Sequence, residues 1–213
     1  MSHALNLLVH ILAGTLGIAL GLLLLARPKG TVLHRRRGQR FVQLVLIVCT
    51  SAMIGLVVFR FMPLFAVLAV LVLYQVVSGW RVARTQHGGP AVADALWTLA
   101  TALAIAALMP RLLANAEQSP VVVRSTLAAT GMLLLYDTVR WVFPRRWHAR
   151  LWPYEHVYRM NGALFGMVAA LVGNTVRVWQ PVSQLLPTAI GSAVTAYYFV
   201  QLSRRPSDGR LSR

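Results

Sequence analysis

The sequence is poor in cysteine, lysine and acidic residues, and each shortage excludes a class of protein. The single cysteine, Cys49, lies inside an apolar run, so the chain has no disulfide framework and no cysteine-based metal motif. The single lysine, Lys29, lies in a basic segment between apolar runs, which excludes a retinal protein, because the Schiff base needs a lysine in the last membrane helix. Charged residues make up 12% of the chain, about half the share in soluble domains, so an ordinary soluble domain is excluded too.

The remaining charge is strongly positive, at a formal +16. Such an excess often indicates a nucleic-acid-binding protein. In a chain that is 57% hydrophobic, however, the excess of Lys and Arg in cytoplasmic loops of membrane proteins explains it better. We therefore expect the lipid bilayer, and no nucleic acid, as the main partner.

The first apolar run, Ala4–Ala26, carries no charge. Its length of about 23 residues is enough to cross a hydrocarbon core of about 30 Å. A cleaved signal peptide would need basic residues before a shorter apolar stretch, whereas here no Lys or Arg precedes the run and the basic segment Arg27–Arg40 follows it. The run predicts a retained membrane helix.

Six more apolar runs follow, separated by short polar or basic links. No link is long enough for a soluble domain, so residues 1–213 are expected to form a single transmembrane helical domain. The predicted fold class is all-α, a polytopic integral membrane bundle of seven transmembrane helices. The seven predicted spans are Ala4–Ala26, Phe41–Phe59, Leu64–Val82, Ala91–Met109, Val121–Val142, His156–Val178 and Val182–Leu202.

The distribution of basic residues predicts the orientation. The links after the first, third and fifth runs, with Arg81 and Arg140 at the ends of the runs beside them, and the C-terminal tail hold 16 of the 21 Lys and Arg residues. Those links and the tail are therefore expected in the cytoplasm. An odd number of spans then places the N-terminus outside and the C-terminus inside.

One stripe of the first run carries small and polar residues at helical spacing: Asn6, His10, Gly14, Gly17 and Gly21. Glycines let a neighbouring membrane helix approach closely, so this stripe is expected to face protein and to carry His10 inward with it. Two interpretations of His10 stay open. It either forms a simple hydrogen bond with a neighbouring helix or belongs to a functional site, because ionisable groups at membrane depth are costly.

The predicted topology collects most of the scarce ionisable groups at the cytoplasmic ends of the helices. Asp137 and Arg140 are spaced to form an i, i+3 ion pair. These groups either lock the helix ends together through ion pairs or form a site for a ligand, proton or metal; a site would need His34 or His156 within hydrogen-bond reach of a carboxylate. The residues concerned are Asp94, Asp137, Arg140, Glu155, His156 and Arg159 at helix ends, and His34, His87 and His148 in the predicted loops.

Haem and zinc sites are the metal alternatives. His156 and Met160 lie one turn apart, and residues so placed cannot take opposite axial positions on one haem. His10 and His156 are predicted at opposite membrane faces, so only a loop histidine could complete a bis-histidine haem with His156. A membrane zinc site would have to draw on His34, His156 and either Asp94 or Glu155, at spacings that match no known motif.

Several short motifs lie along the chain: His10–x3–Gly14, Gly21, Lys29–Gly30, His34–Arg35–x2–Gly38–x–Arg40, Ser78–Gly79–Trp80–Arg81, Asp94, Asp137–x2–Arg140, His156–x2–Arg159–Met160–x–Gly162 and Leu186–Pro187. Together they resemble a bacterial family of predicted multi-pass membrane proteins that carries only a domain-of-unknown-function label. The first-helix pattern is also similar to part of the b561-type cytochromes, which bind haem b. The family resemblance implies a bacterial plasma (inner) membrane location and directs attention to His10, His34 and His156, without implying an activity.

The expected function is transport or sensing of a small ligand, proton or ion through the polar His and carboxylate cluster. The alternative is a haem- or metal-dependent membrane redox protein or assembly factor. The sequence identifies no substrate, leaves open whether haem b or a metal ion binds, and is compatible with a homo-oligomer.

Overall fold

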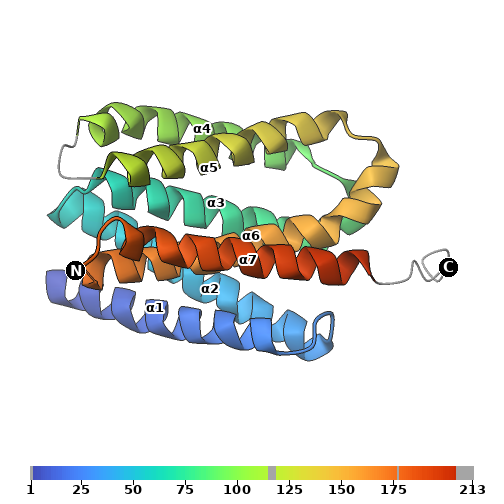
Figure 1. Ribbon diagram of the computed structural model, residues 1–213, viewed down its shortest axis with the longest axis horizontal. Coiled ribbons are helices and arrows are strands. Elements are labelled where there is room, and N and C mark those ends of the chain that lie inside the picture. The colour runs from blue at the N-terminus through green and yellow to red at the C-terminus, as the bar shows by residue number, and fades with distance from the viewer. Residues whose placement is uncertain (1, 115–118, 177, 205–213) are drawn as a thin grey trace.

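The computed structural model describes residues 2–114, 119–176 and 178–204, and these form an all-helical bundle (Figure 1). Five of its helices are long and apolar enough to cross a membrane: α1, α2 with its continuation, α3, α4 and α7. Short segments follow three of the helices: the π-helical η1 (Gly55–Phe59), and the 3₁₀ turns η2 (Gln86–Gly88) and η3 (Arg140–Val142). The described residues contain seven α-helices: α1 His3–Ala26, α2 Val32–Ile54, α3 Pro63–Thr85, α4 Val92–Leu113, α5 Pro120–Val139, α6 Arg145–Thr175 and α7 Val182–Ser203.

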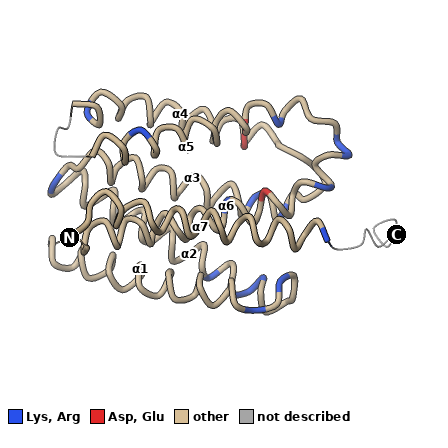
Figure 2. Tube along the Cα trace, viewed as in Figure 1, with Lys and Arg blue, Asp and Glu red and all other residues tan. Residues whose placement is uncertain are grey.

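The seven helices lie side by side along the long axis of the molecule (Figure 1). The connections α1–α2, α3–α4 and α5–α6 lie at the same end as the last turn of α7. Most of the Lys and Arg residues drawn in Figure 2 lie at this end, which we call the basic end. The chain thus alternates in direction from one helix to the next.

Local capping explains several helix starts. The Ser2 side chain accepts a hydrogen bond from the Leu5 backbone N–H at 3.3 Å, and the Thr31 side chain accepts one from His34 at 3.0 Å. Proline occupies the first turn of α3 and α5, where its missing N–H costs nothing. At the other end of α1, Lys29 Nζ donates to the carbonyls of Leu25 (2.5 Å) and Arg27 (2.7 Å), and partial burial lowers its pKa.

The predicted starts of two helices are wrong. Helix α2 begins at Val32 rather than Phe41, and α6 begins at Arg145 rather than His156. Hydropathy detects only the apolar part of a helix. The first turns of α2 and α6 are basic, so hydropathy leaves them out, but they are helical because arginine is a good helix former. Helix α4 also continues through Pro110 to Leu113, beyond its predicted end. The link residue Glu117 lies outside the described residues.

The glycine stripe of α1 faces protein, as predicted. A methyl group added at Gly21 would lie 2.6 Å from Leu164 Cδ1 on α6, and one at Gly17 would lie 3.1 Å from Met167 Cε. Gly14 faces Val48 on α2 at a looser 3.9 Å. These close approaches join α1 to both α2 and α6.

Helices α3 and α6 form the centre of the bundle. At Gly162 an added methyl group would lie 1.7 Å from Gln75 Oε1, and at Gly79 one would lie 2.9 Å from the Met160 sulfur. The buried core joins these two helices to α1 and α2. Because the side chains of these helices pack closely against one another and α7 contributes Val194 to the same core, we treat α1, α2, α3, α6 and α7 as one unit, the five-helix body.

The hairpin formed by α4 and α5 packs differently. Its contact with α3 at the end away from the basic end is an apolar cluster that includes Val67, Ile105 and Val122. Along the rest of the hairpin, large apolar side chains such as Leu99, Leu103 and Leu135 are exposed. A second apolar cluster, in which Leu133 and Trp97 pack against Leu71 and Tyr74, joins the hairpin to α3 nearer its middle.

Candidate functional site

Every acidic residue that the structure describes lies in one group at the basic end of α3, α4, α5 and α6. Figure 2 shows the acidic positions in red among the basic ones. We call this group the charged cluster, and it also contains three arginines and three hydroxyl side chains. Its members are Arg81, Asp94, Asp137, Arg140, Glu155, Arg159, Tyr74, Thr98 and Tyr136.

Asp137 on α5 is the centre of the cluster. Arg159 on α6 binds both of its carboxylate oxygens, with Nη1 donating to Oδ2 at 3.0 Å and Nη2 donating to Oδ1. The Tyr74 hydroxyl from α3 also donates to Asp137. Asp137 is 4% exposed and Arg159 is 1% exposed, so the pair is removed from solvent. A bidentate pair of this kind is among the strongest polar contacts that a protein forms.

The second pair joins Arg140, at the end of α5, to Glu155 on α6. Their closest atoms, Nη2 and Oε2, are 2.7 Å apart, and the Tyr136 hydroxyl donates to Glu155 at 2.6 Å. The expected i, i+3 pair of Asp137 and Arg140 is present only as a 3.8 Å approach. Both residues instead take their main partners from α6, so the cluster joins helices rather than stabilising one helix.

The third pair, Arg81 and Asp94, closes the cluster on the side of the α3–α4 link. Arg81 Nε donates to Asp94 Oδ1 at 2.6 Å, and Nη2 donates to Oδ2 at 3.2 Å. Asp94 also accepts a hydrogen bond from the Ala91 N–H at 2.7 Å, which caps α4. This pair is partly exposed and links the cluster to the surface.

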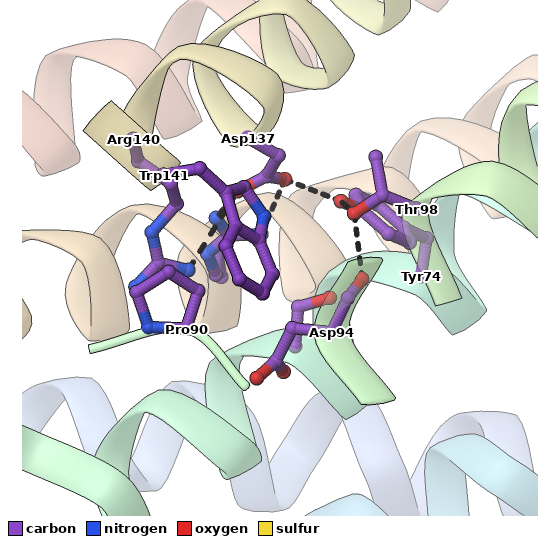
Figure 3. Close-up of a pocket in the computed structure, with 9 residues that line it drawn as sticks. Tyr74, Pro90, Asp94, Thr98, Asp137, Arg140 and Trp141 are labelled. Carbon is purple, nitrogen blue, oxygen red and sulfur yellow. Dashed lines mark hydrogen bonds and ion pairs between the residues drawn. The ribbon is translucent and has the colours of Figure 1, made fainter. Parts of the chain in front are cut away.

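A chain of hydroxyl groups connects Asp94 to Asp137 (Figure 3). The Thr98 hydroxyl donates to the Asp94 backbone carbonyl at 2.9 Å, and its oxygen lies 2.8 Å from the Tyr74 hydroxyl oxygen. The Tyr74 hydroxyl in turn donates to Asp137. A cavity of about 10 Å³ lies beside this chain, large enough for about one water molecule.

Two guanidinium groups of the cluster keep an unused donor. The Nε atoms of Arg140 and Arg159 are buried and have no hydrogen-bond partner among the described residues. Both arginines line the small cavity. Within the cluster, three carboxylates balance three guanidinium groups, so the buried charge sums to zero.

Among the described residues, neither His34 nor His156 lies within hydrogen-bond reach of a carboxylate, so the expected contact is wrong for this part of the chain. His156 Nδ1 lies 3.0 Å from the Gly79 carbonyl oxygen, because α6 rotates it towards α3. His34 lies on the first turn of α2, not in a loop, and its Nδ1 is buried without a partner among the described residues. His148 is likewise on a helix, α6, and His87 lies in η2.

His10 forms the simpler of its two expected contacts. Its Nδ1 lies 3.0 Å from the Ser51 hydroxyl on α2, at the end of the bundle away from the charged cluster. The neighbouring Asn6 donates to the Ser51 carbonyl at 3.1 Å. These contacts support α1–α2 packing.

The described residues contain no group of three or more His, Cys, Asp or Glu side chains arranged to hold a metal ion. The zinc set considered as an alternative, from His34, His156 and a carboxylate, is therefore not assembled among these residues. Met160 packs against Gly79. In the described part of the chain, His156 is the histidine whose arrangement best suits ligation, because an Nδ1–H bond to a carbonyl leaves Nε2 free to bind.

Sequence reasoning missed four residues of the cluster: Tyr74, Thr98, Tyr136 and Arg81. Tyr74 and Tyr136 lie inside apolar runs and resemble core or interfacial aromatics. The available signal was that buried tyrosine hydroxyls need a partner, and carboxylates one helix away could supply it. The sequence singles out Arg81 only as part of the motif Ser78–Gly79–Trp80–Arg81, which does not predict its ion pair with Asp94.

No family model, curated protein or solved structure matches this chain.

Proposed function

We propose that the chain is a seven-span protein of a bacterial plasma membrane, with its N-terminus outside and its basic end in the cytoplasm. The alternating helix directions and the basic residues at one end support this topology. Reporter fusions after Gly30, Gly88, Pro144 and Arg204 should report cytoplasm, and fusions after Ser119 and Pro181 the outside. Two contrary results would exclude the topology.

We further propose that the charged cluster binds a proton in a transport or sensing role. One observation supports this most strongly. The contacts Asp137–Tyr74, Tyr74–Thr98 and Thr98–Asp94 carbonyl need three hydrogens, and the two hydroxyl groups supply only two. A proton on Asp137 would complete all three hydrogen bonds. The same proton would weaken the pairing of Asp137 with Arg159.

Proton binding would thus exchange one arrangement for another. In the charged arrangement Arg159 holds the carboxylate, and α5 is tied to α6. In the protonated arrangement the hydroxyl chain from Asp137 to the partly exposed Asp94 is complete, and the tie to α6 is weaker. An element with two discrete arrangements of this kind can couple a local charge change to helix movement.

Infrared difference spectroscopy of the purified protein tests proton binding directly. Acidification should produce the C=O stretch of a protonated carboxylic acid, and Asp137→Asn should remove that band. Tyr74→Phe should shift it, because the hydroxyl partner is lost. Tyr136→Phe is the matched control, since its hydroxyl contacts Glu155 outside the chain of hydroxyls. An acid-induced band that Asp137→Asn leaves unchanged would exclude Asp137 as the proton site.

Transport and sensing are then separated in liposomes that contain a trapped pH-sensitive dye. A transporter should acidify the lumen after an external acid pulse faster than protein-free liposomes, and Tyr74→Phe should slow it. A sensor should show the infrared band without the flux.

A haem- or metal-binding protein is the second candidate, and the free Nε2 position of His156 favours it. An absorption spectrum of the purified protein tests it. A Soret band that shifts on reduction and disappears in His156→Ala would support haem, whereas its absence after expression with added haem would count against it.

A further inference from the structure

The first turns of α2 carry a group of arginines that the charged cluster does not use. Figure 2 shows basic positions along this part of the helix, which precedes Phe41, the first buried residue of α2. Arg35, Arg36 and Arg40 are exposed, and Arg37 is half-buried. We call these four residues the α2 arginines.

The α2 arginines have no acidic partner in the part of the chain that the structure describes. The three described carboxylates all pair with arginines of the charged cluster. Arg36 and Arg40 lie one turn apart, and like charges at this spacing destabilise a helix. An anion bound beside them would reduce this repulsion. The α2 arginines are therefore suited to an anionic partner.

The packing of α1 on α2 gives the depth of these arginines. A methyl group added at Gly21 would lie 2.9 Å from Phe41 Cε2, so Gly21 and Phe41 are at one level. The two helices run in opposite directions (Figure 1), so the stretch of α1 from Gly21 to its end at Ala26 lies beside the residues of α2 just before Phe41. The α2 arginines are therefore level with the last apolar turn of α1.

The two helices expose both apolar and basic side chains at this level. On α1, Leu22 is 47% exposed and Leu23 is 36% exposed. In the proposed topology this level is the boundary between acyl chains and headgroups, where apolar side chains contact the chains and arginines reach the headgroups. A nucleic acid would supply phosphates but nothing apolar to cover the leucines. The arrangement therefore favours a phospholipid over a nucleic acid.

We propose that the α2 arginines bind the phosphate of an anionic phospholipid of the phosphatidylglycerol type in the cytoplasmic leaflet. Arginine suits this contact, because its planar guanidinium group can donate two parallel hydrogen bonds to one phosphate. Clusters of about four to eight basic residues beside a membrane helix typically attract anionic lipids. The inference rests on the proposed topology, and it adds the class of lipid that this part of the basic end binds.

The test measures which lipid lies next to α2 when the full chain is in phosphatidylcholine vesicles. A bimane fluorophore is attached to Gln43→Cys, an exposed position one turn after Arg40, in a Cys49→Ala background. The vesicles contain a fixed fraction of either phosphatidylglycerol or phosphatidylcholine with brominated acyl chains, which quench bimane on contact. We expect brominated phosphatidylglycerol to quench the fluorophore more strongly than brominated phosphatidylcholine does.

Two double variants show whether the arginines cause this preference, expressed as the ratio of the association constants of the two lipids. Arg36→Gln with Arg40→Gln should lower the ratio about tenfold at low salt, the effect typical of two basic residues at a membrane surface. Arg60→Gln with Arg124→Gln removes the same charge from exposed positions at the other end of the bundle and should leave the ratio unchanged. Added salt should lower the ratio in the parent protein, and this measurement needs no variant.

Equal quenching by the two lipids, or a preference that the substitutions at Arg36 and Arg40 leave unchanged, would overturn the proposal. Loss of the preference on adding a short RNA or inorganic phosphate, at constant ionic strength, would overturn the choice of a lipid as the partner. The vesicles carry the brominated lipid in both leaflets, so the result does not depend on orientation. The lipid preference and the proposed topology can therefore fail separately.

Discussion

The five-helix body and the α4–α5 hairpin are held by different forces. In the body, side chains of one helix pack directly against glycines of the next, as Gln75 does at Gly162 and Phe165 at Gly191, where an added methyl group would lie 2.6 Å from Phe165 Cγ. In the hairpin, a methyl group added at Gly131 would meet nothing within 4 Å. Close packing fixes one arrangement, because an interdigitated interface tolerates little movement.

The hairpin contacts the body through apolar side chains and through ion pairs. Apolar side chains around Ile105 and Val122 join it to α3 at one end, and Leu133 packs with Leu71 and Tyr74 of α3 nearer its middle. The ion pairs of Asp137 and Arg140 join it to α6 at the basic end. Ion pairs can be exchanged by a proton or a ligand without disrupting a packed core. The comparison therefore places the rigid part of the molecule in the body and the switchable part at the basic end of the hairpin.

The largest expected effect follows from breaking the Asp137–Arg159 pair. Arg159→Met leaves a buried carboxylate with no bidentate partner, which should lower the free energy of unfolding by about 4 kcal/mol. Thermal unfolding in detergent measures it. Adding Asp137→Leu to Arg159→Met should restore most of the loss.

Arg81→Met is the matched control for that experiment. Arg81 and Asp94 are partly exposed, so the loss of this pair should cost about 1 kcal/mol or less. Equal losses in Arg159→Met and Arg81→Met would show that burial does not distinguish the two pairs.

The next effect tests glycine packing in the body. Gly191→Ala forces a methyl group against Cγ and Cβ of Phe165, 2.6 and 2.7 Å away, and should cost about 3 kcal/mol, at the upper end for overpacking, because these atoms are fixed close to the backbone of α6. Gly131→Ala in the hairpin should instead be neutral or stabilising by up to about 1 kcal/mol, because alanine is the better helix former. Similar melting temperatures for both variants would contradict the proposed difference between the two regions.

A smaller effect is expected at the edge of the body, on α1. Gly17→Leu should push α1 away from Met167 and Leu44 and cost about 2 kcal/mol. Leu24→Ala removes a partly buried side chain without adding bulk, and we expect a clearly smaller change in thermal stability. If the Leu24 variant is the less stable of the two, the glycine stripe does not limit packing.

The smallest effect concerns the end of α1. Lys29 caps the Leu25 and Arg27 carbonyls and lies 4.8 Å from the centre of the Tyr198 ring on α7. Lys29→Met should therefore cost about 0.5–1 kcal/mol. Arg84→Met, which removes an exposed cation stacked on Trp80, is a control of similar kind. No change in thermal stability for Lys29→Met would show that this cap contributes nothing.

Much of the fold was predictable because long apolar runs separated by polar links are typical of helices long enough to cross a membrane. Seven runs matched seven helices, and the glycine stripe of α1 faces protein as expected. The starts of α2 and α6 were not predictable from hydropathy, since their first turns are helical but basic.

The sequence predicts which acidic residues belong to the site, but not which partners they bind. The carboxylates Asp94, Asp137 and Glu155 do gather at one end, because alternating helices bring their ends together. Which arginine binds which carboxylate depends on the rotation of α6 about its axis, and hydropathy does not report that rotation. The same rotation turned His156 towards Gly79 rather than towards the acids.

Distances between spin labels test most directly whether the ion pairs hold the hairpin. One label pair, at Val142 and Val200, reports the basic end, and a second pair, at Val121 and Val182, reports the opposite end; all four positions are exposed. The buried native Cys49 is replaced by alanine. In Asp137→Asn the Val142–Val200 distance should lengthen and broaden, while the Val121–Val182 distance stays as in the parent protein. Unchanged distances at both ends would contradict the account, because the hairpin would then be held by packing rather than by its charges.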